Sequence, residues 1–230
     1  MTDQARSFGD GTLSRVAGRV YWLLVIEGML LLTLSPGLVL AFWLAPDASN
    51  LPLFALAAVP VGPALAAAFF AWRRFGEERE SSPRTEFQRG YGLNLADALS
   101  AWVPAVAVLL VLAINLTFQA SAGVGGSVAG PVAGLQVGLA VLVLLWAVRM
   151  LSVTSVFSFR WRDAARISLH TVLGRPLSTL ALLSYAVLVV GLTVVTFDAV
   201  VVLLASVLTF AVVRSEAPVI GYVRERFVAA

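Results

Sequence analysis

Few residues in this sequence carry side chains that can do chemistry. Cysteine is absent and histidine occurs once, which excludes thiol catalysis, disulfides and thiolate metal sites and argues against a zinc site. Glu27 and Arg149 stand out instead, because each interrupts a long apolar segment. A carboxylate and a guanidinium in such surroundings fit either an ion pair or a proton or cation relay.

Three interpretations of Glu27 and Arg149 remain open. They form a structural ion pair, or Glu27 is protonated and hydrogen-bonded between helices, or both residues line a solute path. A relay usually uses more than one deeply placed carboxylate, and Glu27 is the only acid that we place deep in an apolar segment. Asp97 is expected near the end of such a segment and His170 on a solvated face. We therefore favour a structural role for the pair.

The composition is typical of a membrane protein. Of the 230 residues, 60% are hydrophobic, and the mean hydropathy is +0.91. A soluble domain of this size needs more polar surface to cover its core. Several runs approach or exceed the ~18 apolar residues of a membrane span, and they lack the alternation of β-barrel strands. The sequence predicts an all-α, polytopic helical bundle in which residues 1–230 form one membrane domain.

Six transmembrane helices are predicted from these runs. Pro60 and Pro63 are expected to kink the second helix, because proline removes a backbone donor and clashes with the preceding turn. The first helix is expected to be retained rather than cleaved as a signal peptide. The predicted spans cover residues 20–44, 51–72, 95–118, 135–157, 177–195 and 199–213.

Two amphipathic segments are predicted to lie on the membrane surface. In the first, residues 85–91, Phe87 and Tyr91 are expected to face lipid while Arg84 and Arg89 stay in water. The second, residues 158–173, has two faces at helical spacing. Its polar face carries Arg162, Arg166 and His170, and its apolar face carries Trp161, Ala165, Leu169 and Val172.

The arginines predict the orientation of the chain. All 16 basic residues are arginine, and six spans with a cytoplasmic N-terminus place every one of them inside, as the positive-inside rule requires. A five-span arrangement puts Arg214, Arg224 and Arg226 outside, so we reject it. Both termini are therefore expected in the cytoplasm. The sequence pI near 9.9 is explained by this retention, and we expect no nucleic-acid partner.

One part of the chain carries a family pattern. The stretch VPVGPALAAAFFAWRRFGEE (residues 59–78) joins a kinked helix of small residues to an arginine-rich, acidic loop, and TEFQRGYGLNLADAL follows at residues 85–99. With the later segment WRDAARISLHTVLGRPLSTL, this order resembles the YesL-like family of bacterial integral membrane proteins, a domain family of unknown function. The resemblance is clearest from Leu13 to Leu109. The positions that carry it are Pro60, Gly62, Pro63, Ala64, Ala67, Phe87, Arg89 and Asn94.

The resemblance implies a function but transfers no catalytic or binding residue. Members of this family are often associated with carbohydrate ABC-type uptake systems. It therefore implies a non-enzymatic accessory in the bacterial inner (plasma) membrane, with the lipid bilayer and a membrane permease subunit as partners and no cofactor.

Two other classes of function were weighed. A small-solute transporter or channel would place Glu27 and Arg149 on its path and use Pro60 and Pro63 as the broken helix of a transporter. An intramembrane enzyme would need Glu27, Asp97 and His170 to converge on one polar cavity, and we expect no enzyme.

Overall fold

The chain is an all-α, multi-pass membrane protein. The computed structural model describes residues 12–75, 81–121, 129–195 and 198–228, and none of these residues forms a β-strand. Six helical segments in this part of the chain are long and apolar enough to cross a membrane, which agrees with the predicted number. They are Val16–Trp43, Ala48–Arg74, Pro83–Ser121, Gly130–Thr154, Pro176–Val195 and Ala205–Phe227.

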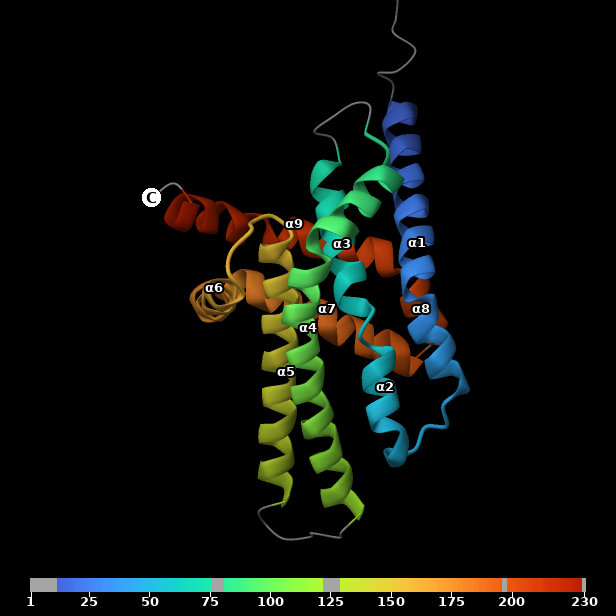
Figure 1. Ribbon diagram of the computed structural model, residues 1–230, viewed down its shortest axis with the longest axis vertical. Coiled ribbons are helices and arrows are strands. Elements are labelled where there is room, and N and C mark those ends of the chain that lie inside the picture. The colour runs from blue at the N-terminus through green and yellow to red at the C-terminus, as the bar shows by residue number, and fades with distance from the viewer. Residues whose placement is uncertain (1–11, 76–80, 122–128, 196–197, 229–230) are drawn as a thin grey trace, which may run out of the picture.

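Three long helices follow the long axis of the molecule. These are α1 (Thr12–Trp43), α4 (Pro83–Ser121) and α5 (Ala129–Thr154). Helices α4 and α5 lie side by side and extend beyond the other elements at one end (Figure 1). The shorter helix α3 (Val61–Arg74) packs against both α1 and α4, so it forms the centre of this part of the fold.

The C-terminal helices take a different direction. After α6 (Trp161–Gly174), the chain forms α7 (Pro176–Val195), α8 (Asp198–Leu203), α9 (Ala205–Val223) and a π-helical turn, η2 (Arg224–Val228). Figure 1 shows α7 and α9 running across the direction of α4 and α5 rather than alongside them. Helix α9 contacts α1, α3, α5 and α7, and it therefore ties the two parts of the fold together.

The second predicted span is broken, not merely kinked. A 3₁₀ turn, η1 (Ala48–Asn50), leads into α2 (Leu51–Ala57), and three residues separate α2 from the start of α3. Pro60 caps α3, and the indole of Trp102 donates a hydrogen bond of 2.8 Å to the carbonyl of Ala58 inside the break. Pro63 lies in the first turn of α3, where a helix has no partner for the missing N–H. It therefore continues the helix.

Small residues let the helices approach closely around α3. Its buried face is rich in alanines that are 0% exposed: Ala64, Ala66, Ala67, Ala68 and Ala71. At Gly62, a Cβ atom would lie 2.5 Å from the Cβ of Trp102 on α4. Such small residues let helix backbones approach closely and gain van der Waals contacts. These contacts help helices associate in a membrane, where lipid is as apolar as the side chains.

The predicted surface helix at residues 85–91 is instead the start of α4. Phe87 is 0% exposed and packs in the protein core, so the prediction that it faces lipid was wrong. Gly90 lies against α3, where an added Cβ would come within 2.8 Å of the Phe70 side chain. The predicted exposure of Arg84 and Arg89 is confirmed. This segment is amphipathic because it packs on α3.

The last helix is longer than predicted. The final span was expected to end at residue 213, yet α9 continues to Val223. Glu216, Val219 and Val223 are each 0% exposed and recur at i, i+3 and i+7, which places them on one helix face. The charged residues of this stretch lower its hydropathy, and for that reason the end of the span was predicted too early in the sequence.

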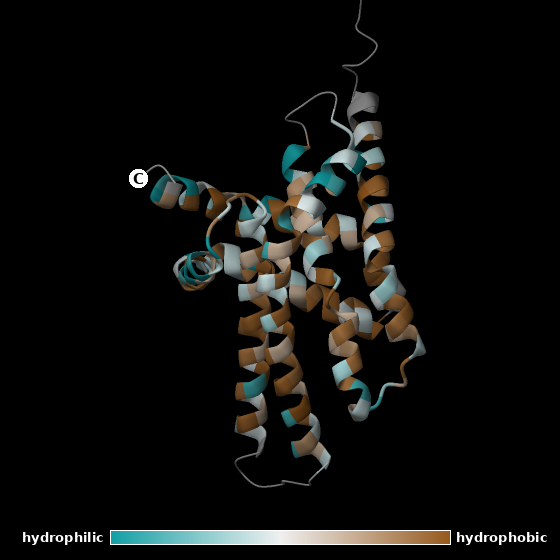
Figure 2. Ribbon diagram, in the orientation of Figure 1, coloured by the Kyte–Doolittle hydropathy of each residue, from teal (hydrophilic) through white to brown (hydrophobic). Residues whose placement is uncertain are grey.

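Polar residues gather at one end of the molecule. In Figure 2, hydrophilic positions concentrate where α3 ends and α4 begins, on α6 and towards the C-terminal end, whereas most of α1, α4 and α5 is hydrophobic. We call this the arginine-rich end, since it carries Arg73, Arg74, Arg84, Arg89 and Arg224. Its assignment to the cytoplasmic side follows from the positive-inside rule and stays a prediction.

Candidate functional site: a buried arginine–glutamate cluster

The strongest polar interaction in the described residues joins α5 to α9. Arg149 and Glu216 are both 0% exposed, and two hydrogen bonds connect them, Nε to Oε2 at 3.1 Å and Nη2 to Oε1 at 2.8 Å. This parallel pair of contacts is the strong, two-point geometry of an arginine with a carboxylate. The carboxylate partner of Arg149 is therefore Glu216, and the predicted pairing of Arg149 with Glu27 was wrong.

The remaining guanidinium nitrogen of Arg149 extends the cluster to two more helices. Its Nη1 donates to the carbonyl of Thr171 on α6 at 2.7 Å and to Oγ1 of Thr179 on α7 at 3.2 Å. A buried charge is stable only when its polar atoms are matched in this way. Arg149 thus holds α5, α6, α7 and α9 at one point.

A second arginine, Arg73 on α3, borders this pair. Its Nη2 donates to Oγ of Ser152 on α5 at 2.8 Å, and its Nη1 donates to Oγ of Ser155, which directly follows α5. The positive charge of Arg73 also attracts Glu216. Because an arginine side chain stays protonated in proteins, these three residues combine two positive charges with one negative charge. The cluster therefore has an excess of positive charge on the side of α3.

Glu27 belongs to a separate site. Its Oε2 accepts a hydrogen bond of 2.7 Å from the backbone N–H of Ser206, in the first turn of α9. The first amides of a helix lack intrahelical partners, and a carboxylate is favoured there. Glu27 on α1 thus caps α9 from another helix. Its other oxygen, Oε1, is buried and has no hydrogen-bond partner among the described residues.

The sequence analysis missed Glu216 and Arg73. Both were assigned to polar segments outside the spans, and for Glu216 a signal was available. Val212, Val213, Val219 and Ile220 flank it at i−4, i−3, i+3 and i+4, which is the spacing of a single buried helix face. For Arg73 the sequence offered no comparable signal, since arginines commonly occur at the ends of membrane helices without taking part in a buried site.

The other candidate residues do not converge. Asp97 lies partly exposed on α4, and His170 is exposed on α6. His170 borders a small hollow together with Arg175 and Tyr222, and neither Glu27 nor Asp97 lines it. The described residues contain no group of three or more His, Asp or Glu side chains that could hold a metal ion. The described contacts therefore do not bring Glu27, Asp97 and His170 together in one polar cavity, as the enzyme hypothesis requires.

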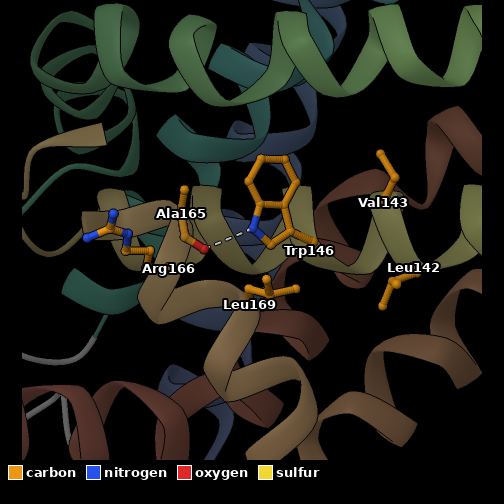
Figure 3. A pocket seen from close by; sticks show the side chains of 6 residues that line it. All are labelled: Leu142, Val143, Trp146, Ala165, Arg166 and Leu169. Carbon is orange, nitrogen blue, oxygen red and sulfur yellow. Dashed lines mark hydrogen bonds between the residues drawn. The ribbon is translucent and has the colours of Figure 1, made fainter. Parts of the chain in front are cut away.

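Helix α6 is fixed beside α5 by a tryptophan. Nε1 of Trp146 donates to the carbonyl of Ala165 at 3.1 Å, beside an apolar groove of about 280 Å³, and Arg166 extends away from it (Figure 3). The predicted polar face of α6 is exposed, while Trp161 and Leu169 of the predicted apolar face are 56% and 47% exposed. Helix α6 therefore buries a face formed by Ala164, Ile167, Ser168, Thr171 and Val172, which shares only Val172 with the predicted apolar face.

Comparisons with known proteins do not extend these observations, because no protein-family model, curated protein or solved structure matches the chain. The resemblance to the YesL-like family stays a prediction. Function has to be inferred from the cluster, from the hollows beside it and from the arginine-rich end.

Proposed function

We propose that this protein is a non-enzymatic accessory of the membrane, which presents its arginine-rich end to a partner membrane protein. The observation that carries the proposal is the complete burial of Arg149 and Glu216 and their mutual hydrogen bonding. Charged groups on a solute path must be reachable by the solute. Charges that are sealed and matched instead fix the relative positions of helices, which suits a scaffold.

Exposed arginines lie around this fixed core. Arg84 and Arg89, near the start of α4, are exposed at the arginine-rich end, and Arg162 and Arg166 are exposed on α6. Charged groups at the rim of an interface mainly set its specificity and rate of association. The resemblance to the YesL-like family adds an identity for the partner, a permease subunit of a carbohydrate ABC-type uptake system in the bacterial inner membrane.

Co-purification from membranes tests this proposal. A tagged copy of the chain, co-expressed with a carbohydrate permease and solubilised in mild detergent, is expected to retain the permease. The variant Arg84→Gln/Arg89→Gln should retain much less. A matched control, Ala48→Asp/Ser49→Asp, changes the net charge equally at the exposed turn between α1 and α2 and should retain the permease fully. Absence of the permease from the unmodified sample would count against the accessory function.

A small-solute transporter is the second candidate, and a specific observation favours it. Oε1 of Glu27 is buried without a hydrogen-bond partner beside the break between α8 and α9, and a second break lies at Pro60. Many transporters bind ions at the exposed ends of such discontinuous helices. Proteoliposomes containing the unmodified chain and Glu27→Gln would decide. A flux that Glu27→Gln leaves unchanged, or no flux at all, argues against this candidate.

A further inference from the structure

A groove of about 570 Å³ lies between the C-terminal end of α3 and α9. Its walls contain three arginines, Arg73 from α3, Arg214 from α9 and Arg224 from the start of η2. The acid nearest to this groove in the cluster, Glu216, does not line it, because both of its oxygens are bonded to Arg149. The groove therefore collects positive charge without a matching carboxylate in its lining.

Two of the three arginines have no protein partner in the described part of the chain. Arg214 and Arg224 are exposed, and no hydrogen bond or ion pair joins the guanidinium group of either one to another described residue. Arg73 is held by Ser152 and Ser155, and its charge exceeds what Glu216 can neutralise alongside Arg149. Guanidinium groups are suited to two-point binding of phosphate oxygens. An anion with phosphate chemistry would balance the groove.

The rest of the lining is apolar and aromatic. Trp72 contacts Phe75 edge to face and Phe210 at a tilt, with ring centroids 5.9 and 4.9 Å away, and its Nε1 donates to Oγ1 of Thr209 at 3.1 Å. These three aromatic residues line the groove together with its arginines. A free phosphate ion would gain nothing from contact with these apolar side chains. A phospholipid would, because its headgroup phosphate is joined to glycerol and acyl chains that can pack against them.

The position along the molecule agrees with a lipid. Arg73 and Arg74 form the last turn of α3, at the end where polar residues gather in Figure 2. Membrane proteins bind anionic headgroups in basic pockets between helices on the side that carries their arginines. We propose that the α3–α9 groove binds the phosphodiester headgroup of an anionic phospholipid, with Arg214 and Arg224 as its principal ligands and Arg73 at its base.

Native mass spectrometry of the purified full-length chain in neutral detergent tests this site. Phosphatidylglycerol, phosphatidylcholine and inorganic phosphate are added separately. One phosphatidylglycerol molecule is expected to remain bound and to raise the apparent Tm. Arg214→Gln/Arg224→Gln should weaken this binding at least tenfold. Ala217→Phe, which fills the groove at an exposed position without changing the charge, should weaken it as well.

The matched control is Arg162→Gln/Arg166→Gln, which removes the same charge from the exposed face of α6 and should leave binding unchanged. An equal loss in the control would overturn the proposal, because it would mean general attraction to positive charge. Equal retention of phosphatidylcholine would overturn it too. Stabilisation by millimolar inorganic phosphate, with no further effect of the lipid, would assign the groove to a free anion instead. An unchanged apparent Tm of each lipid-free variant confirms that it is folded.

Discussion

Arg149 and Glu216 lie 67 residues apart in sequence, and their buried side chains connect α5 to α9 through two hydrogen bonds. Among the described residues, α9 is also hydrogen-bonded to α1 and α3: Glu27 of α1 caps its first turn, and Trp72 of α3 donates to its Thr209. The pair therefore fixes how α9 crosses the molecule. It also makes the stability of the fold sensitive to single substitutions, because removing one partner of a buried ion pair leaves the other charge unmatched.

Glu216→Gln is expected to be the most damaging substitution in the cluster. It leaves Arg149 and Arg73 buried or half-buried without a carboxylate, and the loss should be about 3–5 kcal/mol. Arg149→Met should cost less, because Glu216 keeps the attraction of Arg73. The apparent Tm of the purified protein in detergent measures this order.

The double variant Arg149→Met/Glu216→Leu separates the energy of the ion pair from the cost of burying its two charges. It removes both charges together, so its apparent Tm should fall by less than the sum of the falls in the single variants. Arg162→Met on the exposed face of α6 is the control and should have little effect. Additive losses in the double variant would mean that the two residues act independently.

Glu27 is predicted to act as a hydrogen-bond acceptor for the first turn of α9. Glu27→Gln keeps an acceptor for the N–H of Ser206, whereas Glu27→Leu removes it, at a cost of about 1 kcal/mol, as for other caps. Hydrogen exchange at the Ser206 amide is the direct measurement. It should be fast in Glu27→Leu and close to that of the unmodified chain in Glu27→Gln. Equal exchange in both variants would contradict the capping role.

Hydropathy was enough to predict six helices, and Pro60 and Pro63 were enough to predict a kink in the second, although the helix is broken at Pro60 and continues through Pro63. The partner of Arg149 was not predictable, because nothing local shows that α9 crosses α5. Phe87 was assigned to lipid for a related reason. Lipid and the protein interior are equally apolar, so periodicity identifies the apolar face of a membrane helix without indicating what covers it. The end of α9 was missed because Glu216 is charged, although its partner neutralises it.

Gly90 and Gly92 offer a matched test of how closely the start of α4 packs on α3. An added Cβ at Gly90 would come within 2.8 Å of Phe70, whereas a Cβ at Gly92 would meet no atom within 4 Å. Gly90→Ala should therefore destabilise the protein by about 1–3 kcal/mol through overpacking. Gly92→Ala should be neutral or stabilising by up to about 1 kcal/mol, because alanine favours the helix. Unfolding in detergent compares the two, and equal effects would place this part of α4 away from α3.

The absence of cysteine makes the orientation of the chain testable with single reporters. Ser49→Cys, Ser158→Cys and Val195→Cys all replace exposed residues. Six spans with both termini inside predict that a membrane-impermeant maleimide labels positions 49 and 195 in right-side-out vesicles and position 158 only in inside-out vesicles.

Position 195 decides the direction of the C-terminal helices. Helix α7 runs across α4 and α5 (Figure 1), so labelling of Val195→Cys from outside would mean that α7 crosses the membrane at a steep tilt. If Val195→Cys is protected in both kinds of vesicle while Ser49→Cys and Ser158→Cys react as expected, α7 and α9 enter the membrane without crossing it. All 16 arginines would stay on one side in that case too, because α7 and α9 would then begin and end on the arginine-rich side.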